Sequence, residues 1–206
     1  MSRLKPPFAR LRDRLRSTLL RARFARMGRG TSFQAPGPYL ARASRIALGD
    51  GVFGRPFVRL EAIVSSASPA QGPILTVEDR AYLGFHVSVF ATRGVTIGRD
   101  AYLNGHVTIY DHYPPLDSEE AAAKPAALAD KRVGEVSIGD QAWLGWGAVV
   151  MPGVRLGTHS VLGANSVALE NVPDYCVAVG NPAVVVRRYD ADGGRWVAVK
   201  PGEGKS

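Results

Sequence analysis

The 206-residue sequence lacks the features that define several classes of protein. It has a single cysteine, Cys176, so no internal disulfide can form, which excludes the small disulfide-stabilised secreted domains. No uninterrupted apolar stretch approaches the roughly 20 residues that a membrane-spanning helix requires. The N-terminus also has no apolar core of the kind that a secretion signal carries. We therefore expect one domain with appendages, located in the reducing cytoplasm.

Acidic residues are almost absent from the first 30 positions, where Asp13 stands against ten arginines and lysines. These positions carry a net charge of +9, so the other 176 residues contribute −1 to the total of +8. The basic charge therefore belongs to the tail and not to the body, and we expect no nucleic-acid partner.

A six-residue repeat of aliphatic residues dominates the second half of the chain. Its positions are Ile138, Leu144, Val150, Leu156, Leu162 and Ala168. This period fits neither the turn of an α-helix, about 3.6 residues, nor the two-residue alternation of a simple strand. It suits a triangular coil whose sides are short strands with the aliphatic side chains inside, stacked about 4.8 Å from the next coil. The repeat therefore predicts a parallel β-helix with three sextets in each coil.

The same pattern occurs less regularly upstream. Its positions are Val77, Leu83, Val89, Ile97, Leu103 and Ile109, and Leu48, Gly54 and Leu60 form a degraded earlier coil. The step between Val89 and Ile97 is eight residues instead of six, which predicts a two-residue insertion at a corner.

Residues 110–137 break the repeat and should leave the β-helix as a long loop. Loops of this length inside a compact domain are usually functional. We divide the chain into an N-terminal segment at 1–30, a β-helix domain at 31–180 that carries this loop, and a C-terminal extension at 181–206 whose function stays open.

Residues 95–188 resemble a known family. The stretches VTIGRDAYLNGHVTIYDHYPPLD, VSIGDQAWLGWGAVVMPGVRLGTHSVLGANSV and VPDYCVAVGNPAVVVRR are similar to hexapeptide-repeat acetyltransferases of the maltose, galactoside and nodulation-factor type. The resemblance covers about half of the chain. It implies a mainly β fold, a single-stranded left-handed parallel β-helix, a homotrimer, acetyl-CoA as acyl donor and no metal.

Acyl transfer from a thioester to a hydroxyl needs a general base and donors that stabilise the oxyanion. His112 lies where the repeat opens into the loop, and the resemblance matches it to the catalytic base of the family; the alternative is an exposed histidine at the start of a loop. Asp111 is either a turn residue or a substrate-site residue that orients the imidazole or an acceptor hydroxyl.

His86 and His106 occupy the same position in their sextets, three residues after Leu83 and Leu103, so they should stack on neighbouring coils. We expect both to bind the acceptor. The resemblance supports this for His86, which matches an acceptor-binding Asn of related enzymes. The alternative is that both are exposed corner residues.

The resemblance places the CoA site at Gly145, Trp146, Gly163, Ala164 and Arg187. Small residues allow the cofactor to approach the backbone, and the guanidinium of Arg187 suits the 3′-phosphate of CoA. The alternative is that the glycines are turn residues of the repeat and that Trp146 only packs against protein.

Residues 8–27 place Phe8, Leu11, Leu15, Leu19 and Ala22 on one helical stripe surrounded by arginines. This pattern predicts a basic amphipathic α-helix, with two alternatives for its role. It makes a peripheral contact with the inner face of the membrane, or its apolar stripe covers the open end of the β-helix.

Together these features predict an O-acetyltransferase that acts on a saccharide hydroxyl in exopolysaccharide or lipopolysaccharide biosynthesis. The acceptor, the choice between O- and N-acylation and the acyl chain beyond acetyl stay open. One alternative is a γ-type carbonic anhydrase-like enzyme, which coordinates zinc through three histidines at a subunit interface; His86, His106 and His112 are enough in number. The other is a non-catalytic β-helix scaffold.

Overall fold

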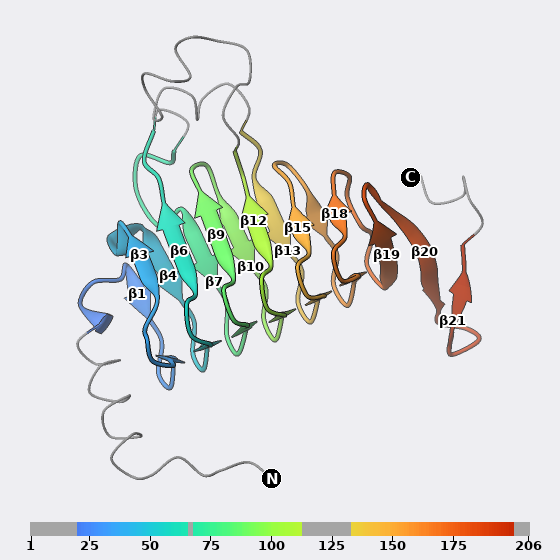
Figure 1. Ribbon diagram of the computed structural model, residues 1–206, viewed down its shortest axis with the longest axis horizontal. Helices are drawn as coiled ribbons and strands as arrows, with labels where there is room; N and C mark the ends of the chain where they lie inside the picture. The colour runs from blue at the N-terminus through green and yellow to red at the C-terminus, as the bar shows by residue number, and fades with distance from the viewer. Residues whose placement is uncertain (1–19, 66–67, 113–132, 200–206) are drawn as a thin grey trace.

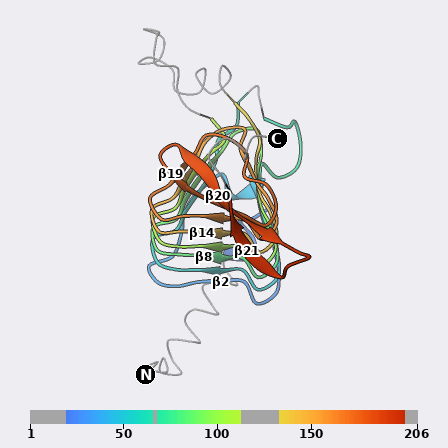
Figure 2. The same cartoon turned by 90° about the vertical axis from the view of Figure 1, so that its right-hand side faces the viewer.

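The computed structural model describes residues 20–65, 68–112 and 133–199. These residues form a parallel β-helix of stacked coils, with β1 at one end of the long axis and β19, β20 and β21 at the other (Figures 1 and 2). The described ranges contain the 3₁₀ turn η1 (Ala43–Arg45), and Leu20 and Arg21 at their start are also helical. The predicted mainly β fold with parallel sheets is confirmed.

Each coil contributes one short strand to each of three sheets, which we name A, B and C in the order the chain visits them. Sheet A consists of β1 (Arg26–Met27), β4 (Ile46–Leu48), β7 (Leu75–Val77), β10 (Val95–Ile97), β13 (Val136–Ile138) and β16 (Arg155–Leu156). Sheet B consists of β2 (Ser32–Phe33), β5 (Phe53–Gly54), β8 (Tyr82–Leu83), β11 (Tyr102–Leu103), β14 (Trp143–Leu144), β17 (Val161–Leu162), β19 (Cys176–Gly180), β20 (Ala183–Asp190) and β21 (Arg195–Ala198). Sheet C consists of β3 (Tyr39–Ala41), β6 (Arg59–Ala62), β9 (Ser88–Ala91), β12 (Thr108–Tyr110), β15 (Val149–Val150) and β18 (Val167–Ala168).

The strand register follows the aliphatic repeat. Ile97 pairs with Val77 on one side and with Ile138 on the other, and Leu103 pairs with Leu83 and Leu144 in the same way. The register holds across the eight-residue step from Val89 to Ile97, as predicted: β9 extends to Ala91, and residues 92–94 connect it to β10. The degraded coil also pairs as predicted, with Leu60 opposite Val89.

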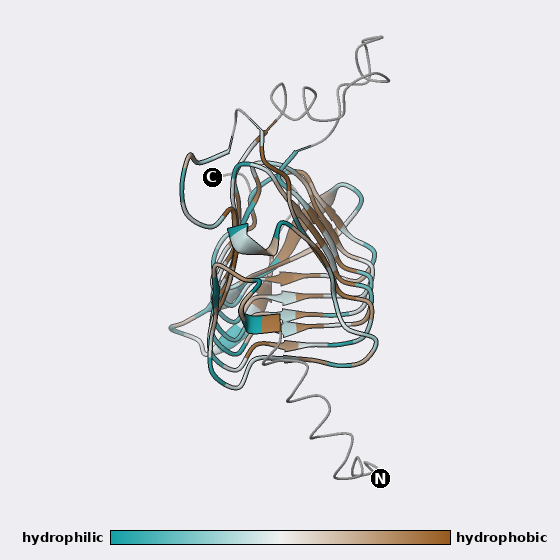
Figure 3. Cartoon of the chain, turned by 90° about the vertical axis from the view of Figure 1, so that its left-hand side faces the viewer, coloured by the Kyte–Doolittle hydropathy of each residue, from teal (hydrophilic) through white to brown (hydrophobic). Residues whose placement is uncertain are grey.

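The core is a column of aliphatic side chains inside the triangle. Leu83, Leu103 and Leu144 are fully buried, one above the other. Burying one such side chain stabilises the fold by about 1.5–3 kcal/mol. Figure 3 shows the apolar residues concentrated on the strands, while polar residues occupy many of the turns.

Glycine and aspartate join successive coils where sheet A turns into sheet B. Asp140 accepts the backbone N–H of Arg99 in the preceding coil at 2.8 Å. It reaches that N–H because Gly98 has no side chain: a Cβ there would lie 2.6 Å from Oδ1 of Asp140. The glycine that follows an aliphatic position thus makes room for the carboxylate of the next coil.

The predicted N-terminal helix lies mostly outside the described residues, and its described end needs a correction. Arg26 and Met27 form strand β1 and pair with β4 of the next coil, because the free edge of that coil offers backbone partners. Phe24 is buried in the core and Leu20 packs against it, whereas Ala22 is exposed. The β-helix therefore begins inside the segment predicted as a separate tail, and residues just before it cover its end.

The predicted C-terminal extension continues sheet B. After a cis peptide bond between Asn181 and Pro182, β20 runs antiparallel to β19, and β21 runs antiparallel to β20. Among the described residues, no helix is long and apolar enough to cross a bilayer.

Candidate active site

The candidate site lies along the edge where sheet C turns into sheet A, which we name the C/A edge. Three neighbouring turns lie here: residues 63–74 after β6, residues 92–94 after β9, and residues 111–135 after β12. The loop predicted at 110–137 is observed at 111–135, so it starts one residue later and ends two residues earlier than predicted. Residues 113–132 lie outside the described part, and an antiparallel bridge between His112 and Val133 closes the base of this loop.

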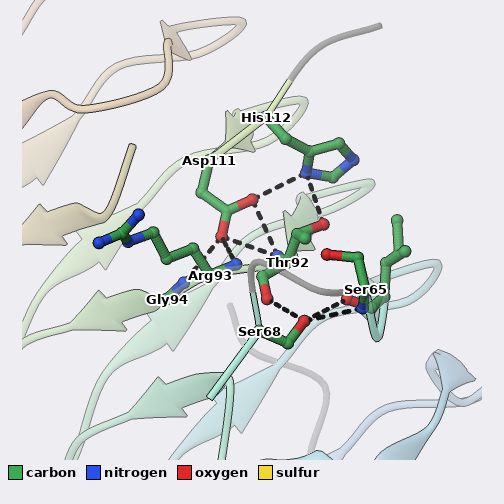
Figure 4. Close-up of polar contacts among 8 residues, drawn as sticks. Ser65, Ser68, Thr92, Arg93, Gly94, Asp111 and His112 are labelled. Carbon is green, nitrogen blue, oxygen red and sulfur yellow. Dashed lines mark hydrogen bonds and ion pairs between the residues drawn. The ribbon is translucent and has the colours of Figure 1, made fainter. Parts of the chain in front are cut away.

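His112 is held through one of its two ring nitrogens. Its Nδ1 lies 2.7 Å from Oδ1 of Asp111 and 3.1 Å from Oγ1 of Thr92, while Nε2 points away from both (Figure 4). The side chain of His112 is 15% exposed. An ionised carboxylate only accepts hydrogen bonds, so Nδ1 carries the proton in the neutral ring, and the lone pair on Nε2 has no partner among the described residues.

Asp111 is fixed by the turn of the preceding coil. Its carboxylate accepts the backbone N–H groups of Thr92, Arg93 and Gly94 at 2.7–2.9 Å, in addition to its contact with His112. The residue is fully buried. We predicted Asp111 as a substrate-site residue with two alternatives, and this geometry favours orientation of the imidazole over contact with an acceptor hydroxyl.

The two other predicted acceptor residues lie on the opposite side of sheet C. His86 and His106 stack with ring centroids 4.8 Å apart, between Phe57 at 4.7 Å and Trp146 at 5.0 Å. The predicted stacking is confirmed. These residues lie on the edge where sheet B turns into sheet C, which we name the B/C edge.

Strand β12 separates this stack from His112. His106 lies before β12 on the B/C edge and His112 after it on the C/A edge, so the two histidines of one chain lie on different edges of sheet C. Within one copy of the chain, the described residues contain no cluster of three metal-binding side chains.

Four of the predicted CoA residues lie together on the B/C edge. Gly145 and Trp146 follow β14, and Gly163 and Ala164 follow β17 in the next coil. A Cβ on Gly145 would lie 2.4 Å from the backbone nitrogen of Ala164, so close stacking of the two corners requires this glycine. Trp146 is half exposed and continues the histidine stack.

Arg187 lies apart from these four residues. It is an exposed residue of β20 and pairs with Val177 of β19, at the C-terminal end of sheet B.

Cys176 does not offer a nucleophile for a covalent acyl intermediate. The side chain is buried, and desolvation raises the pKa of its thiol even though the nearby Arg188 opposes the shift. Only the thiolate attacks acyl groups well, and it is scarce at neutral pH when the pKa is raised.

Two site residues escaped sequence reasoning: Thr92, which contacts the imidazole, and Ser68, which donates to the Thr92 carbonyl oxygen at 2.5 Å. For Thr92 the one signal was the eight-residue step between Val89 and Ile97, because Thr92 lies within that step. Nothing in the repeat pattern pointed to Ser68.

Comparison with known proteins adds sequence and fold relationships. The family described as "Hexapeptide repeat of succinyl-transferase" matches residues 135–168. WbbJ of Escherichia coli K12, provisionally named a lipopolysaccharide biosynthesis O-acetyl transferase, is 31% identical over 127 residues, which cover 60% of this chain and 65% of WbbJ. The galactoside O-acetyltransferase of Lactococcus lactis is 33% identical over 109 residues, covering 53% of this chain and 50% of that enzyme. The chain thus spans between half and two thirds of the length of these relatives.

Two solved structures share the fold. AntD, an N-acyltransferase from Bacillus cereus in complex with dTDP and 3-hydroxybutyryl-CoA, superposes with a TM-score of 0.70 at 15% identity, covering 86% of this chain and 89% of AntD. PerB from Caulobacter crescentus, in complex with CoA and GDP-perosamine, gives a TM-score of 0.51 at 23% identity, covering 84% of this chain and 65% of PerB. At these identities the likeness concerns the fold alone.

Proposed function

We propose that this hexapeptide-repeat protein is an acyl-CoA-dependent O-acetyltransferase that acts on a saccharide hydroxyl with His112 as general base. The observation that carries the proposal is the fixed imidazole, whose Nδ1 is bound to Asp111 while Nε2 has no partner in the described part of the chain. The similarity to proteins named O-acetyltransferases supports the reaction class. The CoA held by two proteins of similar fold supports the donor.

The proposed reaction is direct transfer in a ternary complex. Nε2 of His112 takes the proton from the acceptor hydroxyl as its oxygen attacks the thioester carbonyl. The tetrahedral intermediate then collapses, the carbon–sulfur bond breaks, and the imidazolium returns the proton to the CoA sulfur. The Asp111 carboxylate stabilises the imidazolium and keeps the ring in the tautomer that starts the reaction. A positioned base of this kind contributes about 10²–10⁴-fold to the rate.

We assign the two substrates to the two edges of sheet C. CoA would lie along Gly145, Trp146, Gly163 and Ala164, with Arg187 near its 3′-phosphate. Because the histidine stack and His112 lie on opposite edges, an acceptor that contacts both needs two copies of the chain. This separation supports a homotrimer of left-handed β-helices, in which the C/A edge of one copy faces the B/C edge of the next.

The exposed aromatic surface also supports assembly. Tyr102, Trp143 and Trp146 are each between 41 and 51% exposed on sheet B and at the B/C edge. Contiguous apolar side chains of this size are usually covered by a partner. A single species of three times the 22.0 kDa chain mass in light scattering is the expected result.

A peripheral position on the cytoplasmic face of the inner membrane is the proposed location. Residues 20–49 hold six arginines and no acidic residue; four of the six belong to the tail at 1–30, and Arg42 and Arg45 of the first coil add to its basic charge. Arginines attract anionic lipid headgroups at about 1 kcal/mol each near the surface. This charge would bring the enzyme to lipid-linked or envelope saccharides.

The decisive experiment measures CoA release from acetyl-CoA with a panel of free sugars, nucleotide sugars and polysaccharide repeat units, followed by product mass. His112→Ala should lose at least about a hundredfold in kcat. His159→Ala is the matched control, since His159 stacks on Tyr175 in the turn between β16 and β17, away from the C/A edge, and the variant should retain full activity. Equal activity of His112→Ala and the unmodified protein would overturn the proposal. A product acylated only on nitrogen would overturn the assignment as an O-acetyltransferase.

A further inference from the structure

The short turn at residues 92–94 is held from both sides by its neighbours on the C/A edge. From the following coil, the Asp111 carboxylate accepts the backbone N–H of Thr92. From the preceding coil, the Ser68 hydroxyl lies 2.5 Å from the Thr92 carbonyl oxygen and 3.2 Å from that of Ile63. It also accepts the N–H of Ser65 at 3.0 Å. Thr92 therefore connects residues 63–74 to the turn that carries the base (Figure 4).

Every polar atom of Thr92 has a partner, and the residue is fully buried. Its hydroxyl is the atom that touches the site, at 3.1 Å from Nδ1 of His112. Because Asp111 already accepts the Nδ1 proton, the Thr92 oxygen is a second acceptor that approaches the same N–H from another direction. A ring held by one acceptor can swing about that contact, whereas a ring between two acceptors has a defined plane.

We propose that Thr92 is a positioning residue for the general base, and that Ser68 links the 63–74 segment to it. Thr92 does not touch the reacting atoms. It sets the plane of the His112 ring, and so the direction of the Nε2 lone pair toward the acceptor hydroxyl. Misplacing a base by about 1 Å can cost about a hundredfold in rate, so small shifts of this ring should be visible in kcat.

This inference rests on the proposed function, because it needs His112 to be the base. Thr92→Val keeps the shape of the side chain and removes the oxygen, and Thr92→Ser keeps the oxygen. Thr31→Val is the matched control: Thr31 is also buried, and its hydroxyl donates to the Gly49 carbonyl oxygen at 2.6 Å and accepts the Val52 N–H at 3.1 Å, in the first two coils.

The expected result is a loss of about tenfold in kcat for Thr92→Val, the effect of one hydrogen bond to a group that becomes charged. The KM for acetyl-CoA should stay within about twofold, because the donor site lies elsewhere. Thr92→Ser should recover kcat to within about threefold. Thr31→Val should lower the unfolding temperature about as much as Thr92→Val does, without changing kcat.

Ser68→Ala tests the link. We expect a loss of about threefold in kcat in the unmodified background and no further loss in Thr92→Val, because both changes act on the same ring. Additive losses would overturn the link to Ser68. If His112→Ala loses activity but Thr92→Val keeps its kcat, the inference alone is overturned. Full activity of His112→Ala would overturn the proposed function and the inference with it.

Discussion

The two edges of sheet C turn in different ways. On the B/C edge, the five turns from the one between β5 and β6 to the one between β17 and β18 all have four residues, such as 84–87 and 104–107. On the C/A edge the successive turns have 4, 12, 3, 25 and 4 residues. Equal turns place equivalent side chains above one another, which gives the stack of His86 and His106. Unequal turns break this order and bring unlike residues together, which gives Asp111, His112 and Thr92. The regular edge holds the coils in register, and the irregular edge assembles a site.

The largest expected effect concerns the carboxylate that organises the irregular edge. Asp111→Ala should lower kcat by at least about a hundredfold and the free energy of unfolding by about 3 kcal/mol, because it frees the imidazole and leaves the N–H groups of Thr92, Arg93 and Gly94 without their acceptor. Denaturant unfolding and CoA release measure the two effects. Asp111→Asn should fold better, since its amide oxygen still accepts, but remain slow. Full activity in Asp111→Asn would contradict the role given to the carboxylate.

Glycine substitutions should separate the edges by stability. Gly145→Ala on the regular edge puts a Cβ 2.4 Å from the Ala164 backbone nitrogen, so we expect a loss of about 1–3 kcal/mol in the free energy of unfolding. Gly94→Ala on the irregular edge brings its Cβ no closer than 3.4 Å to Cγ of Glu135, an exposed side chain that can move. It should cost less than about 0.5 kcal/mol. Equal losses would mean that the two edges do not differ in how tightly their coils stack.

His106→Ala should affect substrate binding and not chemistry. The variant removes one ring from the stack, which costs about 0.5–1.5 kcal/mol of packing. We expect a raised KM for the acceptor with kcat within about threefold, the opposite of His112→Ala. Steady-state kinetics with a saturating donor measure the split. A large fall in kcat for His106→Ala would instead place chemistry on the regular edge.

The sequence predicted the regular parts of this structure more completely than the irregular parts. The aliphatic repeat predicted the register of β7, β10 and β13, including the eight-residue step, because each coil repeats the same burial. It also located the loop after β12 and, through a family resemblance, singled out His112. It did not find Thr92 and Ser68, which lie 20 and 44 residues before His112 in the chain and reach it through turns that follow no period. It also continued the N-terminal helix through Arg26 and Met27, where pairing with the next coil favours a strand.

The smallest expected effect concerns Cys176, which belongs to neither edge. Burial raises the pKa of its thiol above the ordinary value of 9.0. The unfolded chain therefore loses this proton at a lower pH than the folded one, so the contribution to stability is complete below pH 9 and falls as the pH rises further. Unfolding midpoints between pH 8 and about 10.5 should decline slightly more in the native protein than in Cys176→Ala, and activity should be equal in both. Loss of activity in Cys176→Ala would favour a covalent route.

The protonation state of the His112 ring tests the central claim most directly. With ¹⁵N-labelled histidine, the four histidines give a small set of nitrogen signals, and His112→Ala identifies the signals of His112. The account predicts that the neutral ring carries its proton on Nδ1, toward Asp111, and that Nε2 gives the signal of an unprotonated nitrogen. A ring with its proton on Nε2 would contradict it, because that nitrogen could not then accept the proton of an acceptor hydroxyl.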